Sequence, residues 1–303
     1  MAESKTPLVS IIVPTFNSAR TIGVTLEAIR QQTYPSIETV VVDNYSADNT
    51  REIARKYGAM VYQVGPERAS QDNYGVKEAN GEFVFITGSD MIIDRDYIEQ
   101  AVSKCIRDEY DAIYASVITE GDGFWAKVKG LERLTYIGDD FFESARFFRR
   151  RVFLDLGGYD ETLVLNADDY DMQHRLDMAG YRTGRITAVE RHTDEPTSLR
   201  QLAQKSYYYA KFAKRYIGRY PAHATRQLFP IRLPFIRHID ILLKDPVHFL
   251  GLIAFKVVQY SAAFCGFIVS LVSKEQLDQS MHQRIYGAGA EDENLRDEQE
   301  KDS

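Results

Sequence analysis

The chain has 303 residues, enough to bury one large α/β core with an appendage or two modest domains. Its formal net charge of −7 argues against a nucleic-acid-binding protein, which usually presents a basic surface. The two cysteines, Cys105 and Cys265, lie far apart and match neither a disulfide framework nor a metal-ligand spacing, which favours a reducing compartment. The N-terminal residues lack a basic start followed by a long apolar run, so no signal peptide is expected.

Short β-branched runs alternate with helical patterns over the first 90 residues. Residues 9–13 form an apolar run ended by Pro14, which is typical of a strand buried on both faces. We expect strands at residues 9–13, 38–43, 60–64 and 83–86, separated by helices at residues 18–32, 50–57 and 69–79. Strands that alternate with helices in this way predict an α/β fold with a Rossmann-like, mostly parallel sheet flanked by helices.

The following part of the chain has a more mixed pattern. We expect a strand at residues 112–115, a helix at residues 169–179 and one basic helix over residues 200–220. A dense basic cluster comprises Arg146, Arg149, Arg150 and Arg151. This cluster either meets the phosphates of an acceptor or forms a solvated face.

Polar clusters follow three of the expected strands. They are Pro14-Thr15-Phe16-Asn17, Asp43-Asn44-Tyr45-Ser46 and Gly88-Ser89-Asp90. Ligands of open parallel sheets bind at the carboxyl ends of the strands. The sequence therefore predicts that these clusters meet in one ligand-binding cleft.

Beyond Pro221 the composition becomes more apolar. Residues 250–272 are long and apolar enough to cross a bilayer, but Lys256 and Gln259 make a full crossing costly, unless Lys256 extends to an interface. We expect membrane association, either spanning or lying flat, with an ordinary core helix as the alternative. The expected domains are a catalytic domain at 1–200, a basic, amphipathic and apolar helical region at 201–275, and a disordered acidic tail at 276–303.

Several short motifs occur in a fixed order. They are VSIIVPTFN at 9–17, VDNYSADNT at 42–50, Glu67-Arg68 with Gln71, Asn73 and Gly75, GEFVFI at 81–86 leading to Asp90, GGYDE at 157–161, and DDYD at 168–171 with Arg175 and Gly180. In this order and spacing the chain resembles the family 2 glycosyltransferases, inverting enzymes with the GT-A fold, from about Pro7 to His192. The resemblance implies a transferase that uses a nucleotide sugar.

By resemblance, the strand-end loops hold the nucleotide-sugar donor. Asp43 would accept a hydrogen bond from a base N–H, although an Asx turn is the alternative interpretation. Arg68 would contact a phosphate through its forked donors, or form an exposed salt bridge. Ser46 and Asp48 are expected to order the turn and cap the next helix. The residues assigned to donor binding are Pro14, Thr15, Asn17, Asp43, Asn44, Arg68, Asn73, Ser89 and Asp90.

The resemblance also implies a divalent cation, Mg²⁺ or Mn²⁺, bound to Asp90. The family normally has an Asp-x-Asp triplet, but here the first position is Gly88. Loss of that carboxylate should weaken metal affinity, and replacing Gly88 with Asp should restore it. His192 lies where related enzymes supply a further metal or phosphate contact, although a lone histidine is often structural.

Asp168 and Asp169 match the acidic pair of the family. By resemblance Asp169 is the general base that takes the proton of the acceptor hydroxyl, so that one displacement inverts the anomeric configuration. Asp168 would raise the basicity of Asp169 by like-charge repulsion. The alternative is that both carboxylates only stabilise the start of the following helix.

These features together predict an inverting transfer from a UDP- or GDP-sugar to a hydroxyl of a lipid-linked glycan at the cytoplasmic face of a membrane. A polyprenyl-phosphate glycosyl synthase is one alternative, because an ionised phosphate acceptor needs no base. A non-catalytic nucleotide-sugar-binding scaffold is the other, because Gly88 departs from the metal-binding motif. The expected partners are the donor, a lipid-linked or glycan acceptor and a membrane surface, but no nucleic acid.

Overall fold

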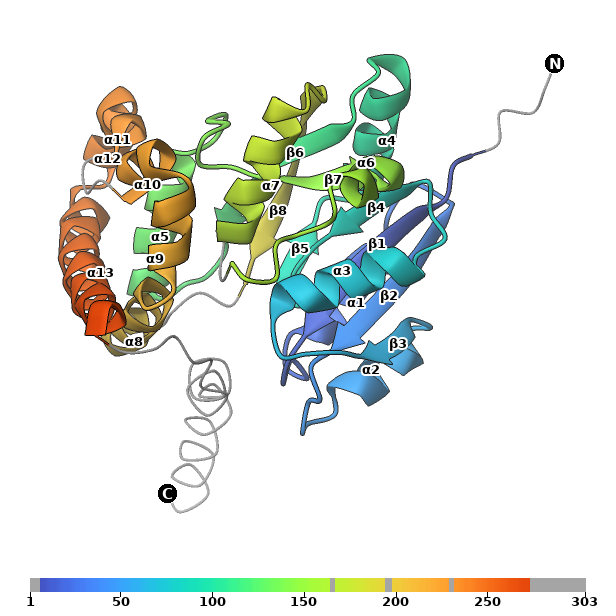
Figure 1. Cartoon of the computed structure of the whole chain (residues 1–303), viewed down its shortest axis with the longest axis horizontal. Helices are drawn as coiled ribbons and strands as arrows, with labels where there is room; N and C mark the ends of the chain where they lie inside the picture. The colour runs from blue at the N-terminus through green and yellow to red at the C-terminus, as the bar shows by residue number, and fades with distance from the viewer. Residues whose placement is uncertain (1–5, 164–166, 194–197, 229–231, 273–303) are drawn as a thin grey trace.

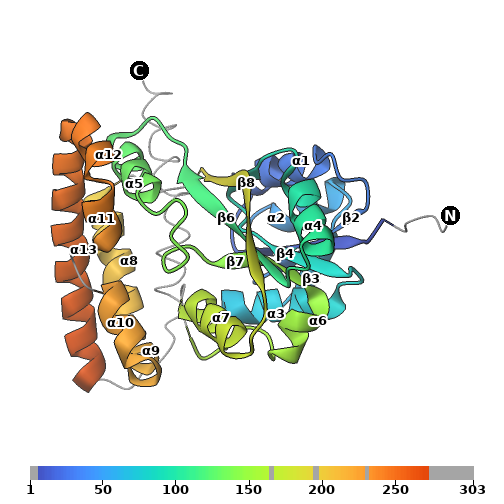
Figure 2. The same ribbon diagram turned by 90° about the horizontal axis from the view of Figure 1, so that it is seen from above.

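The computed structural model describes residues 6–163, 167–193, 198–228 and 232–272. An α/β part and a group of helices lie side by side (Figure 1). Viewed from above, the long helix α13 (Pro246–Val272) forms the edge of the molecule farthest from the sheet (Figure 2). The predicted disordered tail at 276–303 falls outside the described residues.

The described residues form an eight-stranded sheet in the order β3-β2-β1-β4-β7-β6-β8-β5. Its strands are β1 (Val9–Thr15), β2 (Ile37–Asp43), β3 (Met60–Gln63), β4 (Phe83–Ile86), β5 (Met91–Ile93), β6 (Ala112–Thr119), β7 (Ala145–Arg149) and β8 (Thr183–His192). β1 to β4 are parallel to one another, as are β6 and β8, whereas β7 and β5 join antiparallel. The predicted mostly parallel α/β sheet is confirmed.

Helices cover both faces of the sheet. The remaining elements are α1 (Ile22–Arg30), α2 (Thr50–Lys56), α3 (Arg68–Glu78), α4 (Tyr97–Arg107), α5 (Phe124–Leu134), α6 (Arg150–Asp155), α7 (Ala167–Met178), α8 (Leu199–Ala210), α9 (Ala213–Arg219), α10 (Pro221–Leu228), α11 (Leu233–Arg237) and α12 (Ile239–Lys244). Ile11 of β1 packs in the apolar layer with α1, α2 and α4. Its neighbour Ile12 packs in the opposite layer with α3, α6 and α7, as expected for a strand buried on both faces.

Two expected elements differ from the structure. The basic helix over residues 200–220 is wrong as a single helix, because α8 ends at Ala210 and α9 begins at Ala213. Lys211 and Phe212 donate their N–H groups to the carbonyls three residues earlier, which tightens the chain into a turn. The strand predicted at residues 112–115 is longer and runs to Thr119, with an irregularity after Tyr114.

A separate apolar cluster joins α5 to the C-terminal helices. It consists of Val128, Leu131, Leu202, Leu242, Leu252 and Phe255. α5 precedes β7 in the chain and touches β6 through Arg133, yet its apolar side chains pack with α8 and α13 (Figure 2). The helical part is therefore built from two distant stretches of sequence.

Lys256 of α13 points into this helical part. Its Nζ lies 2.5 Å from Oε1 of buried Glu132 and 2.8 Å from Oε1 of Gln259. Burial alone would raise the pKa of Glu132, but the cations of Lys129, Lys256 and Arg232 hold it well below its usual range. The expectation that Lys256 extends toward a membrane interface is wrong, because the ion pair with Glu132 fixes it between helices.

Gly75 allows α3 to pack directly on the sheet. A Cβ at this position would overlap Cγ2 of Ile12 and lie 3.1 Å from Cγ2 of Val42. Gly130 occupies a similar place in the middle of α5, but its nearest neighbour to a Cβ, the Thr119 carbonyl oxygen, is at 3.7 Å. The two glycines thus have opposite packing environments in helices of equal length.

We predict that Gly75→Ala lowers the free energy of unfolding by about 1–3 kcal/mol, because the added methyl overpacks the core. Gly130→Ala should instead raise it by up to about 1 kcal/mol, since alanine has the better helix propensity. Urea unfolding followed by circular dichroism measures both. Equal effects of the two substitutions would contradict the close approach of α3 to β1 and β2.

Candidate active site

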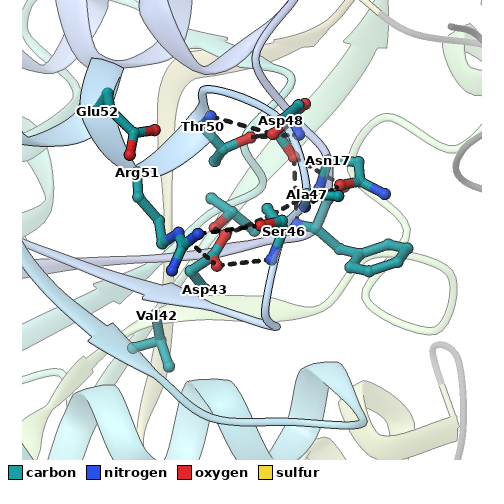
Figure 3. Close-up of polar contacts among 12 residues, drawn as sticks. Asn17, Val42, Asp43, Ser46, Ala47, Asp48, Thr50, Arg51 and Glu52 are labelled. Atoms are coloured by element: carbon teal, nitrogen blue, oxygen red, sulfur yellow. Dashed lines mark hydrogen bonds and ion pairs between the residues drawn. The ribbon is translucent and has the colours of Figure 1, made fainter.

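Asp43 and Thr15 end two adjacent parallel strands, and their side chains meet. They are partners in the register of β1 and β2, and Thr15 Oγ1 donates to Asp43 Oδ1 at 2.9 Å. Asp43 is fully buried and also accepts from the backbone N–H of Ser46 at 2.9 Å and from Ser46 Oγ at 2.5 Å (Figure 3). Asp43 therefore orders the following loop, but through Ser46 three residues on rather than through the residue two positions on that an Asx turn requires. Its assignment to base recognition stays a prediction.

The loops after β1 and β2 are tied together by further hydrogen bonds. Asn17, in the left-handed region with φ of 48°, donates its N–H to Ser46 Oγ at 2.8 Å and accepts from the Ala47 N–H at 2.9 Å. Asp48 accepts from the N–H groups of Ala19 and Thr50, each at 3.0 Å (Figure 3). The expectation that Ser46 and Asp48 order this turn is confirmed.

Buried Gln71 holds α3 over the ends of β1 and β2. Its Nε2 donates to the Thr15 carbonyl at 3.0 Å and to the Val42 carbonyl at 2.5 Å. Pro14 lies within β1 opposite Val42. Asn44 donates to the Pro66 carbonyl at 2.8 Å, next to the start of α3. The N-terminus of α3 is therefore fixed beside the strand-end loops.

Asn73 of α3 positions the loop before α7. It donates to the Tyr159 carbonyl at 2.9 Å and accepts from the Tyr159 N–H at 2.8 Å. Gly158, with φ of 73°, allows this approach, because a Cβ there would lie 2.5 Å from Asn73 Oδ1. In this structure Asn73 thus orders protein backbone, and its assignment to donor binding stays a prediction.

Arg68 joins the start of α3 to the start of α7. Its Nη2 lies 3.1 Å from Asp168 Oδ2 and 3.2 Å from Asp169 Oδ2. Both carboxylates are buried in the first turn of α7, where the helix dipole favours negative charge. The structure therefore brings together three of the predicted site residues.

The two carboxylates of this pair have opposite pKa shifts. Burial raises the pKa of Asp168, and Arg68 offsets only part of that rise. Burial also acts on Asp169, but Arg68, Arg146 and a hydrogen bond from Tyr159 outweigh it and lower the pKa. The expectation that Asp168 makes Asp169 more basic is wrong for this state, because nearby cations outweigh like-charge repulsion.

Several residues at this site were not predicted. Arg146 of β7 lies 3.7 Å from buried Glu190 and provides one of the cations that act on Asp169. The basic cluster in the sequence drew attention to Arg146, but two of the neighbouring arginines bind backbone carbonyls elsewhere. Arg149 donates to the carbonyls of residues 105 and 110, and Arg150 to those of residues 76 and 77. Arg146, Arg149 and Arg150 therefore have separate protein partners, whereas Arg151 is exposed to solvent.

Asp72 is the least satisfied group near Arg68. It is fully buried, neither carboxylate oxygen has a hydrogen-bond partner, and the nearest cation, Arg68 Nε, is 3.7 Å away. Burial raises its pKa well above the usual range, with Asp168 and Asp169 adding to the effect of burial. Burial and Asp168 also raise the pKa of Glu67 to about 7. No sequence pattern distinguished Asp72 from an ordinary helix residue.

Asp90 and His192 meet where β5 and β8 pair. His192 Nε2 lies 3.3 Å from Asp90 Oδ2, and Thr193 donates its N–H and Oγ1 to the Asp90 carbonyl. Ser89 donates to Ser18 Oγ at 2.8 Å, which links this loop to the loop after β1. Among the described residues, no group of three or more His, Cys, Asp or Glu side chains is arranged to hold a metal ion.

A cavity of about 340 Å³ lies away from these residues, at the helical part. It is lined by residues 137–141 together with Arg226, Arg237 and His238. None of the residues predicted to bind donor or metal lines it. The cavity is therefore separate from the site at the strand ends.

Comparisons with known proteins identify similar chains. A family model described as "Glycosyl transferase family 2" matches residues 10–160. Glycosyltransferase AglE of Haloferax volcanii is 33% identical over 109 residues, covering 33% of this chain and 36% of AglE. A PGL/p-HBAD biosynthesis glycosyltransferase of Mycobacterium bovis is 29% identical over 172 residues, covering 54% of this chain and 67% of the relative. In three of the curated relatives that it matches, the aligned part of the chain covers 35%, 36% and 44% of the relative's length.

Solved structures share the fold. Mannosyltransferase PcManGT from Pyrobaculum calidifontis, in complex with GDP-Man and Mn²⁺, has a TM-score of 0.59 at 19% identity, covering 90% of this chain and 89% of that one. S. aureus TarS 1–349 in complex with UDP-GlcNAc has a TM-score of 0.52 at 17% identity, covering 89% of this chain and 94% of that one. At this level of identity the likeness shows a GT-A-type fold.

The buried carboxylate of Asp72 gives a prediction about pH. Its folded pKa is raised, so its contribution to stability is present below the unfolded pKa of about 4 and is lost as the pH rises through the folded value. Asp72→Asn removes the ionisable group and should stabilise the protein increasingly as the pH rises above about 4, by about 1–3 kcal/mol at neutral pH, with no gain near pH 4. Thermal unfolding from pH 4 to 9 measures the difference.

Asp160 is the matched control. Burial tends to raise its pKa, but hydrogen bonds from Thr162 and the Arg219 cation lower it overall. Its stabilising contribution is therefore present above the unfolded pKa and is lost as the pH falls through the folded value. Asp160→Asn should destabilise by about 0.5–1 kcal/mol at neutral pH and less in acid. A destabilised Asp72→Asn at every pH would contradict the unpaired state of Asp72.

Proposed function

Because the chain belongs to glycosyl transferase family 2, we propose that it transfers a sugar from a UDP- or GDP-sugar to a hydroxyl of a membrane-associated, lipid-linked acceptor, with inversion. The observation that carries this proposal is the Asp169 carboxylate, buried and held ionised at the start of α7 beside Arg68 and Arg146. A carboxylate in this position suits a general base that receives the hydroxyl proton as the acceptor oxygen attacks the anomeric carbon. The site acts at the cytoplasmic face of a membrane.

The donor base binds at Asp43. Its carboxylate has about four acceptor positions, and three are used by Thr15 and Ser46. The remaining position is on Oδ2, where Arg51 Nε approaches to 3.7 Å. Movement of the partly exposed Arg51 side chain would open this position to a base N–H.

Arg68 exchanges partners when the donor binds. Its guanidinium faces the buried pair Asp168 and Asp169, and a diphosphate would compete for the same forked donors. Transfer of Arg68 to the diphosphate would remove the main cation beside Asp169. Since that cation lowers the pKa of Asp169, its departure would make Asp169 a stronger base when the acceptor arrives.

Asp90 and His192 would hold Mg²⁺ or Mn²⁺. The 3.3 Å approach of a carboxylate to an imidazole fits a site of this kind, because such cations are commonly bound by one or two protein ligands plus substrate phosphates. The bound cation would neutralise charge on the leaving diphosphate. Gly88 supplies no carboxylate, so the protein part of this site is small.

Two alternatives differ from this proposal in one property each. A polyprenyl-phosphate synthase needs no base, and the positioning of Asp169 favours a hydroxyl acceptor over it. A nucleotide-sugar-binding scaffold would bind the donor without turnover. Transfer measured over a panel of hydroxyl and polyprenyl-phosphate acceptors, with and without Mn²⁺, separates all three.

We predict that Asp169→Asn reduces transfer to a hydroxyl acceptor at least about a hundredfold and leaves donor affinity within a few-fold, because the substitution removes the base but retains the shape. Asp177→Asn, at the other end of the same helix, is the control and should keep wild-type turnover. Initial rates with radiolabelled donor and a thermal-shift titration measure the two effects. Wild-type turnover by Asp169→Asn would exclude the proposed base.

A second prediction concerns Gly88, which replaces the first Asp of the Asp-x-Asp motif. A Cβ at this position would lie 2.6 Å from Asp90 Oδ1, so any side chain displaces the Asp90 carboxylate. Gly88→Ala therefore serves as the control for that displacement. Gly88→Asp should bind Mn²⁺ about tenfold more tightly than Gly88→Ala, because it adds a carboxylate to the site. Mn²⁺ titration followed by electron paramagnetic resonance measures the affinity, and equal affinities would refute the metal-binding role of this loop.

A further inference from the structure

The outer side of α13 is apolar along most of its length, with exposed Ser261 as a polar residue near the middle. Its exposed large side chains are Val247, Leu250, Ile253, Val257, Phe264, Ile268, Leu271 and Val272. The only charged residue in this helix is Lys256, and it is buried against Glu132. The helix thus presents to solvent an apolar face about 40 Å long, at 1.5 Å per residue.

The inner side of α13 is packed against protein at both ends. A Cβ at Gly251 would lie 2.8 Å from Phe124 and 2.7 Å from Val128 of α5. A Cβ at Gly266 would overlap the Tyr207 carbonyl oxygen of α8. Gly251 and Gly266 let the α13 backbone approach α5 and α8 closely, and the Lys256 ion pair lies between them. These contacts hold α13 along α5 and α8.

This packing argues against a membrane-spanning α13, although the helix is long and apolar enough to cross a bilayer. A spanning α13 would carry α8 into the hydrocarbon with it, and α8 exposes Arg200 and Gln204 on its other side. Burying such groups in lipid costs several kcal/mol. With its contacts intact, the helix fits a membrane only when it lies parallel to the surface.

The apolar face continues onto the two short helices before α13. Leu233 and Ile236 of α11 and Ile239 and Leu243 of α12 are exposed. Arg237 of α11 and Lys244 of α12 are exposed on the same two helices, with side-chain exposures of 62% and 77%. An apolar face bordered by cations complements an anionic lipid surface.

A second copy of the chain fits this face less well. Exposed residues at positions 247, 250, 254, 257, 261, 264, 268 and 271 follow the three-and-four spacing of a coiled-coil seam. Such seams are flanked by charged residues that set pairing. Here the flanking exposed positions are apolar, at Ile253, Cys265 and Val272. The face is too broadly apolar for a single helix to cover.

We propose that the exposed face of α11, α12 and α13 docks in the interfacial layer of an anionic bilayer, with α13 parallel to the membrane plane and no segment of it crossing. The proposal deepens the membrane location in the proposed function, but lipid docking does not require sugar transfer. It assigns one surface and one orientation to the membrane-bound protein.

The first test is flotation of the full-length protein with vesicles, without donor or acceptor. We expect binding to vesicles in which roughly one lipid in three is phosphatidylglycerol and the rest phosphatidylcholine. It should be at least about tenfold stronger than binding to pure phosphatidylcholine, because the exposed cations attract anionic lipid. Leu250→Glu and Phe264→Glu should each reduce binding at least about tenfold, since they place a charge in the apolar face. Ile106→Glu, an exposed apolar position on α4, is the control and should bind like wild type.

The second test measures depth at Cys265, which is exposed on the outer face, whereas Cys105 is buried. A fluorophore attached to Cys265 should be quenched more by spin labels near the lipid headgroup than by labels at the bilayer centre. Stronger quenching at the centre would overturn the parallel orientation. Dimerisation in solution that Leu250→Glu abolishes, without vesicle binding by the wild type, would assign the face to a second copy instead.

The outcomes for docking and for catalysis are distinguishable. If Leu250→Glu loses vesicle binding but keeps transfer to a water-soluble acceptor, docking is an independent function of this face. Unchanged vesicle binding by both face variants would overturn the docking proposal and leave the proposed transfer untouched. Truncation is a poorer test, because removing α13 would leave Glu132 buried without Lys256.

Discussion

The contact of Arg68 with Asp168 and Asp169 is the interaction on which the site depends. It joins the first turns of α3 and α7, which are a hundred residues apart in the sequence. Removing charged groups from water is costly, and an incompletely neutralised buried cluster stays costly after pairing. Here two carboxylates and nearby Asp72 share one guanidinium, with Arg146 adding a second cation farther off. The cluster therefore adds little net stability, which fits the exchange of partners that we propose for Arg68.

A hydrogen-bond donor that enters this cluster could bind to carboxylate oxygens that have no hydrogen-bond partner. Asp168 Oδ1 and both oxygens of Asp72 are buried without hydrogen bonds, whereas almost all buried polar groups in proteins are satisfied. By contrast, the strand-end loop that holds Asp43 is well satisfied, with Thr15, Ser46 and Asn17 locked together. The rigid half of the site suits a fixed, flat ligand such as a base, and the unsatisfied half suits a group whose charge changes during a reaction.

Local patterns predicted the elements whose residues act within one strand or helix. β-branched runs predicted β1 and β2, and the polar residues after them predicted the meeting of Thr15 and Asp43. The patterns could not predict where α5 packs, because its partners Leu202 and Leu252 lie more than seventy residues away. Lys256 was misread for the same reason, since its ion pair with Glu132 depends on tertiary contact. The opposite shifts of Asp168 and Asp169 likewise come from Arg68 and Arg146, which are remote in sequence.

The helical part and the site are mechanically connected through α7. Tyr220, which follows α9, donates to Asp171 of α7 at 2.5 Å, and the rings of Tyr170 and Tyr216 lie 6.4 Å apart. α7 thus has its first turn at the strand-end site and its side against α9, in the helical part that carries the apolar face of α11, α12 and α13 farther out (Figure 1). If that face rests on a lipid surface, α7 fixes the height of Asp169 above it. A hydroxyl presented at a defined distance from the bilayer would then reach the Asp169 carboxylate without further movement of the domain. Fixed positioning of this kind lowers the entropy cost of bringing two reactants together.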